Sequence, residues 1–144
     1  EFLSTTFMQE RLPLIMDAVV GAGVPHCVLM SAYGVGDTVR SASFLMRVAC
    51  KTIMRSIFRD RAKADAMVAK YQPYISRALP GRLTDEPGKG GAKVVDVTSV
   101  AHVPGIPTIA REDVADALLD IAGDPLNAGT DFLVTIEDVV IRAA

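Results

Sequence analysis

The chain has 144 residues and a mass of 15.3 kDa, which suffices for one domain or for part of one. Half of its residues are hydrophobic, so it can bury a core, and this composition excludes a wholly disordered chain. Its 15 basic and 17 acidic side chains give a net charge of -2, which offers no basic excess for nucleic acid or for an anionic membrane. We expect neither partner.

The cysteines and the lack of long apolar runs indicate a cytoplasmic protein. Cys27 lies in a short apolar run and Cys50 on an apolar helix face, where both fit reduced, buried thiols, although a disulfide between them stays open. No run approaches the roughly 20 apolar residues that span a bilayer, and no basic-then-apolar signal peptide opens the sequence.

An amphipathic helix is predicted near the N-terminus. The hydroxyls of Ser4, Thr5 and Thr6 can cap it, and glycines at positions 21 and 23 end it. Apolar residues at spacings of three and four form one stripe, which carries Met8, Leu12, Ile15, Met16 and Val19. This stripe is expected to face the core.

A buried strand and a long helix follow. Residues 26–31 form a short apolar run bounded by turn residues, which is typical of a buried parallel strand, and residues 32–38 form a loop with two glycines. Helical spacing of apolar residues then predicts one helix over residues 41–70. Its predicted core face carries Phe44, Leu45, Val48, Ile53 and Ile57.

The second half of the chain alternates strands with a helix. Pro73 bars further helix, so residues 74–79 are predicted as a strand, and a loop rich in proline and glycine follows at 80–91. Residues 92–97 and 131–136 are further predicted strands. Residues 103–108 are expected to be irregular, and residues 111–122 to form a helix.

This order of elements predicts an α/β protein with a parallel, doubly wound sheet and helices on both faces. The chain provides three or four strands, so the strand at 26–31 would lie at an unpaired edge although it is apolar. Such an edge favours pairing with a second chain, and we expect a homo-oligomer formed through it.

The long predicted helix carries closely spaced charges of both signs. They are Arg55, Arg59, Asp60, Arg61, Lys63 and Asp65. Mixed signs favour a solvated helix face over a binding site for an anionic partner.

Three segments resemble a known family. They are Val28-Leu29-Met30-Ser31-Ala32-Tyr33-Gly34, Leu79-Pro80-Gly81-Arg82-Leu83-Thr84-Asp85-Glu86-Pro87 and Ala110-Arg111-Glu112-Asp113-Val114-Ala115-Asp116. Together they resemble the atypical short-chain dehydrogenase/reductases, in the branch that holds NmrA-like proteins and NAD(P)H-dependent flavin or biliverdin reductases. The likeness covers about residues 8–136. It implies a single domain over residues 1–144 that forms the C-terminal part of an NAD(P)-binding Rossmann-like fold, with the N-terminal half and its glycine-rich loop missing.

The resemblance also implies a cofactor, NADP or NAD, and a small-molecule substrate. Ser31 ends a strand, and ligands of open α/β sheets bind beyond such ends. In the family, a serine here lies near the nicotinamide and can donate a hydrogen bond to the substrate oxygen that gains charge. Ser31 and Tyr33 are therefore the catalytic candidates, and Ser31 and Ala32 are expected to contact the cofactor. The alternative is a serine that only caps the turn.

Pro80 and Gly81 resemble the family's Arg-Pro-Gly turn, whose backbone runs along the nicotinamide. We expect both residues, and Arg82 after them, to contact the cofactor. Two simpler interpretations stay open. The Pro-Gly pair also suits a plain tight turn. Arg82 could form a salt bridge with Asp85 or Glu86, and this salt bridge is the favoured interpretation of its charge.

Two positions depart from the family pattern. Leu79 stands where an arginine is usual, and Arg61 stands where many relatives have a lysine. Arginine cannot readily shuttle a proton, so the cofactor would supply most of the chemistry. These departures keep a second hypothesis open, namely a non-catalytic module that senses dinucleotides or self-associates.

The remaining motifs carry no chemistry. His26 and His102 have no partner at the spacing of metal ligands, and no Cys-x-x-Cys is present, so no metal is expected. The acidic residues after Ala110 suit the first turn of a helix, and we assign them a capping and packing role.

Overall fold

The computed structural model describes residues 6–35, 38, 40–52 and 55–142. Its helices are α1 (Phe7–Gly21), α2 (Phe44–Lys51), α3 (Arg55–Met67), η2 (Ala69–Tyr74), η3 (Val97–Ser99), α4 (Arg111–Gly123) and η4 (Pro125–Asn127). Its strands are β1 (Cys27–Met30), β2 (Ile75–Pro80), β3 (Arg82–Thr84), β4 (Lys93–Asp96), β5 (Val100–His102), β6 (Thr108–Ala110), β7 (Asp131–Thr135) and β8 (Val140–Ile141). The four predicted strands and the predicted helix at 111–122 are thereby confirmed within a residue or two.

The main sheet has the strand order β1-β2-β7-β4. β1, β2 and β7 are parallel, as expected, but β4 runs antiparallel to β7. The prediction of parallel pairing is therefore wrong for β4, which lies at the outer margin, where mixed sheets commonly carry an antiparallel strand. β1 lies at the opposite margin, so its predicted edge position is confirmed.

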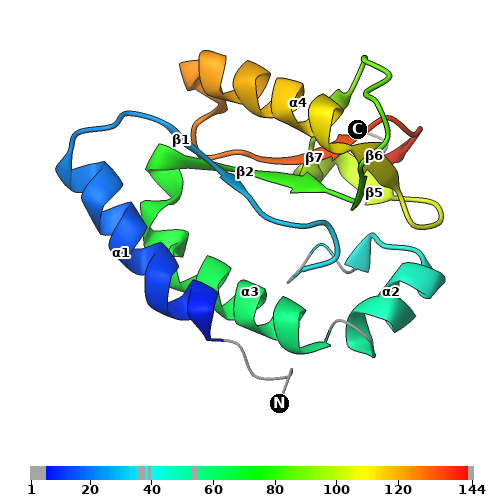
Figure 1. Ribbon diagram of the computed structural model, residues 1–144, viewed down its shortest axis with the longest axis horizontal. Helices are drawn as coiled ribbons and strands as arrows, with labels where there is room; N and C mark the ends of the chain where they lie inside the picture. Colours follow the sequence, from blue (N-terminus) through cyan, green and yellow to red (C-terminus); the bar gives the residue numbers. More distant parts are fainter. Residues whose placement is uncertain (1–5, 36–37, 39, 53–54, 143–144) are drawn as a thin grey trace.

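Helices cover both faces of this sheet. Figure 1 shows α4 on one face and α1 and α3 on the other. Successive side chains of β2 point to opposite faces of the sheet. Ala78 packs in a cluster with Val114 of α4, whereas Ile75 packs in a cluster with Met16 of α1, and Leu79 joins a third cluster around Tyr33.

The predicted single helix over residues 41–70 is wrong, because the structure has two helices there. α2 ends before Thr52, whose hydroxyl donates to the Val48 carbonyl at 2.8 Å, while its backbone N–H reaches the same oxygen at 3.0 Å. A threonine that bonds this carbonyl competes with helix continuation. α3 then begins at Arg55 and ends at Met67, ahead of the 3-10 helix η2.

The predicted core face of this region is also wrong. Ile53 lies outside the described residues. The other members are exposed, namely Phe44, Leu45, Val48 and Ile57. Met46 is 7% exposed instead and packs in the cluster around Tyr33 and Leu133. The docking of α2 thus turns a different side of the helix inward.

The start of α1 is held by a side chain of α3. Ser4 and Thr5 lie outside the described residues, and Thr6 makes no side-chain cap bond. Asp60 of α3 accepts the backbone N–H groups of Met8 at 3.2 Å and Gln9 at 3.4 Å. These bonds satisfy N–H groups that a helix start leaves without partners.

The apolar stripe of α1 is buried in its middle. Leu12 and Met16 are buried, and Met8 and Val19 are partly buried against the same cluster. Ile15 is 55% exposed, so its predicted burial is wrong. None of the described helices is long and apolar enough to cross a membrane.

Two short strands pair at or within segments that were expected to be loops. β3 falls within the predicted loop at 80–91, and β6 begins where residues 103–108 were expected to be irregular. The two strands pair in parallel, with Arg82 opposite Thr108, and the Arg82 N–H also donates to the Pro107 carbonyl at 2.8 Å. Local sequence patterns do not report such a partner, because the strands are three residues each.

Candidate functional site

The carboxyl ends of β1 and β2 are joined by backbone hydrogen bonds. Ser31 N–H donates to the Ala78 carbonyl at 2.8 Å, and Tyr33 N–H donates to the Pro80 carbonyl at 2.9 Å. The structure thereby brings Ser31, Ala32 and Tyr33 alongside Pro80 and Gly81, at the sheet edge where ligands of open α/β sheets bind.

Ser31 is buried, and its hydroxyl is engaged on two sides. Its Oγ donates to Asp65 Oδ2 at 2.9 Å and accepts from Arg61 Nε at 3.2 Å. These directions follow from the chemistry, since an ionised carboxylate only accepts and a guanidinium only donates. One lone pair of Oγ remains. Ser31 can therefore accept one further hydrogen bond as it stands, but it can donate to a substrate oxygen only after leaving Asp65.

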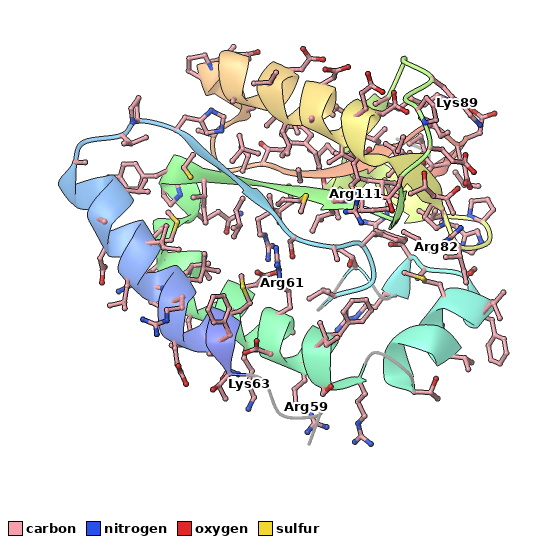
Figure 2. All side chains as sticks on the ribbon, in the orientation of Figure 1. Arg59, Arg61, Lys63, Arg82, Lys89 and Arg111 are labelled. Carbon is pink, nitrogen blue, oxygen red and sulfur yellow. The ribbon has the colours of Figure 1, made fainter. Side chains whose placement is uncertain are left out.

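Arg61 does not belong to a solvated basic face. Figure 2 shows its side chain directed from α3 toward the sheet, whereas Arg59 and Lys63 point away from the protein. Burial lowers the pKa of Arg61, and the charges of Asp65 and Asp60 oppose this shift. The prediction of a solvated helix face is wrong for Arg61, Asp60 and Asp65. Arg61 is half-buried, and both aspartates are buried.

An ion network extends from Ser31 across the sheet. Asp65 Oδ2 also accepts from Arg77 Nη1 at 3.3 Å. Arg77 binds Asp131 in a bidentate manner, with Nε–Oδ1 at 2.9 Å and Nη2–Oδ2 at 2.5 Å. The hydrogen bond that Arg77 donates to Asp131 is the main cause of the raised pKa of Arg77. Sequence reasoning missed this network, and the one local signal was the four-residue spacing of Arg61 and Asp65, which places both on one helix face.

Tyr33 is 1% exposed, and its hydroxyl lies 2.8 Å from Ser41 Oγ. Because Ser41 Oγ donates its own proton to the Thr38 carbonyl at 3.1 Å, the tyrosine is the donor of the shared bond. Burial raises the pKa of Tyr33. The phenol therefore stays protonated near neutral pH. Ala32 beside it is half-buried, and its carbonyl accepts the Val35 N–H at 3.4 Å.

Gly81 allows two backbones to approach closely. A Cβ at this position would lie 2.2 Å from the Pro107 carbonyl oxygen and 2.8 Å from its carbon. Neither atom can move away as a flexible side chain could, so the position requires glycine for packing. This requirement exists whether or not a cofactor lies nearby.

Arg82 is exposed, and the favoured ion pair with Asp85 does not form. Asp85 instead binds Arg111 at 2.7 Å, and no partner of the Arg82 side chain occurs among the described residues. Figure 2 shows Arg82 and Arg111 on the same side of the molecule, near β6. Arg82 thus has a cationic group in solvent beside the Pro80-Gly81 turn.

The acidic residues at the start of α4 anchor the loop before β4. Glu112 accepts the Gly88 N–H at 2.8 Å, and Asp113 accepts those of Lys89 at 3.1 Å and Gly90 at 2.8 Å. The predicted packing role of this segment is confirmed, although the amides that it binds lie in the loop.

A cavity of about 520 Å³ opens between α3 and the strands β2 and β7. Its lining includes Asp65, Arg77, Leu79 and Asp131. Asp65 therefore connects two places, since one of its oxygens binds Ser31 while the residue also forms part of the cavity wall.

No cluster of three or more potential metal ligands of the histidine, cysteine or carboxylate kind occurs in the described part of the chain. Cys27 is a free, half-buried thiol, and burial raises its pKa. The side chain of Cys50 lies outside the described residues.

The residues at the β1–β2 edge fit the nicotinamide end of an NAD(P) cofactor. The remaining lone pair of Ser31 Oγ suits an amide N–H such as that of the carboxamide, and the Pro80-Gly81 backbone lies on the neighbouring strand. The pyrophosphate end has no such fit, because the turn after β1 contains Gly34 and Gly36 but no third glycine at a helix start.

Residues 4–125 match a family described as NAD(P)H-binding. Comparison with curated protein sequences gives no match. A short-chain dehydrogenase/reductase from Veillonella parvula DSM 2008, solved in complex with NADP, has a TM-score of 0.71 and 15% identity, covering 92% of this chain and 60% of that chain.

Two further solved structures give similar values. ChuY, described as an anaerobillin reductase from Escherichia coli O157:H7, has a TM-score of 0.66 and 19% identity over 88% of this chain and 57% of that one. A putative NAD-dependent epimerase/dehydratase from Bacillus halodurans has a TM-score of 0.66 and 19% identity over 88% of this chain and 53% of that one.

The chain thus spans between half and two thirds of the length of these structures. At such low identities the likeness establishes the fold, which is part of a Rossmann-like α/β sheet. The family match covers most of the chain and agrees with the expected NADP or NAD cofactor. The chain therefore belongs to the NAD(P)H-binding family, whose fold it shares with short-chain dehydrogenase/reductases.

Proposed function

We propose that this chain contributes the nicotinamide end of an NAD(P)H-dependent oxidoreductase, which transfers hydride to a flavin, a quinone or a small carbonyl compound. One observation carries the proposal. In a chain of the NAD(P)H-binding family, Ser31 to Tyr33 and Pro80-Gly81 lie side by side at the carboxyl ends of adjacent parallel strands.

NAD(P)H, when bound, would supply the hydride, and the side chains of this chain would position the reactants. Ser31 would accept a hydrogen bond from the nicotinamide carboxamide while its own O–H stays hydrogen-bonded to Asp65. After exchange of that bond it would donate to the substrate oxygen instead. Tyr33 would form part of the wall of the site, and its bond to Ser41 would hold the loop that follows β1. Arg82 would attract an anionic part of the cofactor or substrate.

A titration of the purified chain with NADPH and with NADH, followed by cofactor fluorescence, tests the proposal. Turnover is then measured as oxidation of NADPH with FMN, menadione or a pyridine aldehyde as acceptor. We expect saturable binding, weakened at least threefold by Ser31→Ala and unchanged by Ser56→Ala on α3. Absence of binding up to millimolar cofactor would contradict a cofactor site in this chain.

The second candidate is a dinucleotide-sensing or self-association module without turnover, in the manner of NmrA-like proteins. Arg61 favours it, because this residue stands at the family's lysine position and is fixed between Ser31 and nearby carboxylates as a permanent cation. Saturable NADPH binding with no oxidation by any of the three acceptors would favour this candidate over the reductase.

Self-association through β1 is proposed as well. β1 is the margin of the main sheet, and its last residue, Met30, is 41% exposed. Light scattering over a range of concentrations should give a mass above the 15.3 kDa of one chain. Met30→Lys should lower that mass, since lysine blunts strand edges, whereas Met67→Lys on α3 should not. A mass of one chain at every concentration would contradict the proposal.

A cytoplasmic location remains our proposal for the cell. It is supported by Cys27, which is a free thiol with no disulfide partner among the described residues. Fractionation of cells that produce the tagged protein would test it.

A further inference from the structure

We propose that the exposed apolar side of α2 and the basic side of α3 together dock on the surface of a membrane that contains anionic lipids. The contact is with the surface of the bilayer, where an amphipathic helix lies in the plane of the headgroups, and no helix has to cross it. The inference does not depend on the proposed oxidoreductase activity.

Charge is distributed unevenly along the chain. Residues 40–63 hold seven of the 15 basic side chains and one of the 17 acidic ones, so this segment has a formal charge of +6. The other residues hold eight basic and 16 acidic side chains and carry a charge of -8. The total of -2 therefore hides a strongly basic segment, and it does not exclude an anionic membrane as a partner.

The basic side chains of α3 face the solvent. Arg55, Arg59 and Lys63 are exposed at spacings of four, so they lie along one side of the helix, and none of them forms an ion pair among the described residues. Figure 2 shows Arg59 and Lys63 pointing away from the protein. Asp60, the acidic residue of the segment, is instead buried against the start of α1. α3 thus presents a row of cations to a partner.

The apolar part of the docking surface lies on α2. Phe44, Leu45 and Val48 are 82%, 62% and 41% exposed. At about 100° per residue, these three side chains share one side of the helix. Met46 lies on the opposite side and packs in the cluster around Tyr33. Figure 1 shows α2 at an outer corner of the molecule, beside one end of α3. Apolar surface that is exposed in this way favours a partner that removes it from water.

The combination of the two parts favours a bilayer as the partner. Arg47 is exposed and flanks the apolar side of α2. An apolar side with phenylalanine and leucine beside basic residues is typical of helices that lie in the interface of anionic membranes. Each basic residue near such a surface strengthens binding roughly fivefold. The convex side of a helix can enter the headgroup region of a bilayer directly, whereas a folded protein would have to offer a matching groove.

Sedimentation with lipid vesicles tests the proposal. The purified chain is mixed with vesicles of phosphatidylcholine alone, or of phosphatidylcholine and phosphatidylglycerol in equal amounts. We expect binding to the anionic vesicles to be at least tenfold tighter than to the neutral ones, because several basic residues contribute. Binding should weaken at high salt, since dissolved ions screen the attraction.

A fluorescent reporter locates the contact. The chain contains no tryptophan, so Phe44→Trp introduces a single indole on the apolar side of α2. Its emission should shift to shorter wavelength when anionic vesicles are added, because insertion removes the indole from water. Leu126→Trp is the control. Leu126 is 89% exposed in η4, outside the docking surface, and emission from this position should not shift.

Two matched pairs of variants separate the apolar and the basic contributions. Phe44→Ser should weaken binding to anionic vesicles at least fivefold, whereas Leu119→Ser on α4, where the side chain is 71% exposed, should not. Arg59→Glu should also weaken binding at least fivefold. Lys89→Glu makes the same change of charge far from Arg59, as Figure 2 shows, and should have little effect. All four positions are exposed, so the fold should persist.

Three results would overturn a membrane surface as the partner. They are equal binding to neutral and anionic vesicles, no binding to either, and binding of Phe44→Ser as tight as that of Leu119→Ser. Two more would assign the surface to another partner and overturn the proposal as well. Soluble polyglutamate that displaced the chain from vesicles and bound Phe44→Ser less tightly would indicate an acidic protein. A lower mass of Phe44→Ser in light scattering without lipid would indicate a second copy of this chain.

Discussion

The Ser31 hydroxyl donates a hydrogen bond of 2.9 Å to Asp65, and this bond connects the end of β1 to the last turn of α3. The two residues are 34 positions apart, and both are buried. The serine at the candidate site is therefore an acceptor toward any ligand until Asp65 releases it.

Asp65→Ala should destabilise the protein. Ser31 would lose its acceptor, and Arg77 would keep only Asp131. Because Arg77 retains that partner and is partly exposed, we expect a loss of about 2 kcal/mol in the free energy of unfolding, below the ~3–5 kcal/mol for a buried charge left wholly unpaired. Urea denaturation measures it. Asp116→Ala on the exposed side of α4 is the control, and equal losses for both variants would contradict the importance of the network.

Gly81→Ala should also destabilise the protein, because the added methyl group would meet the Pro107 backbone at 2.2 Å. We expect a loss of about 2–3 kcal/mol, as for other overpacked positions. Gly123→Ala at the end of α4 is the matched control, since no atom lies within 4 Å of a Cβ there.

Thermal denaturation compares the two glycine variants. The control should be neutral or slightly stabilising, as alanine lowers the entropy of the unfolded chain. If Gly81→Ala behaved like its control, the close contact with Pro107 would not constrain the β3–β6 region.

Asp60→Asn should weaken the attachment of α1 to α3 in a pH-dependent manner. Burial alone would raise the pKa of Asp60, but hydrogen bonds from Gln9 and Met8 and the charge of Arg61 together hold it below its ordinary value of 3.8. A depressed pKa stabilises the folded state above pH 3.8, and this contribution declines as the pH falls through the folded-state value.

Urea unfolding at a series of pH values checks this. The free energy of unfolding of the variant should be lower by about 1 kcal/mol at neutral pH, as for a lost helix cap. This difference from the unmodified chain should shrink below pH 3.8. Asp138→Asn is the control, because the exposed Asp138–Lys93 pair should contribute little. A loss at neutral pH that persisted unchanged in acid would contradict an electrostatic role for Asp60.

Tyr33→Phe should remove a buried phenol whose pKa is raised. Burial raises the pKa of Tyr33 above its ordinary value of 10.0. The folded state therefore holds this proton more tightly, and the associated stability is full below pH 10.0 and declines as the pH rises through the folded-state value. An ultraviolet absorbance titration of the phenolate bands should show that a step above pH 10.0 is lost in the variant.

In the same variant, the free energy of unfolding at neutral pH should fall by about 1 kcal/mol, because the hydrogen bond to Ser41 is lost. Tyr74→Phe is the control, since Tyr74 is 44% exposed and its change should be smaller. If the titration above pH 10.0 were the same in Tyr33→Phe as in the unmodified chain, the raised pKa of Tyr33 would be contradicted.

Local patterns determined most of the regular elements and the family. The strands at 75–80 and 131–135 and the helix at 111–123 are each specified by apolar periodicity and by prolines or glycines at their ends, which act within a few residues. The segments at 28–34 and 79–87 indicated the family for the same reason, as they are contiguous. The positions of Ser31 and Pro80 at strand ends followed from this.

Tertiary contacts decided what those patterns leave open. Whether Phe44 or Met46 of α2 faces inward depends on which side docks, and the direction of β4 depends on its pairing with β7. The link from Ser31 through Asp65 to Asp131 joins residues far apart in the chain. Such contacts arise only when separate elements pack. The sequence therefore predicted solvated charges on α3, whereas folding buries Asp65 between Ser31 and a cavity.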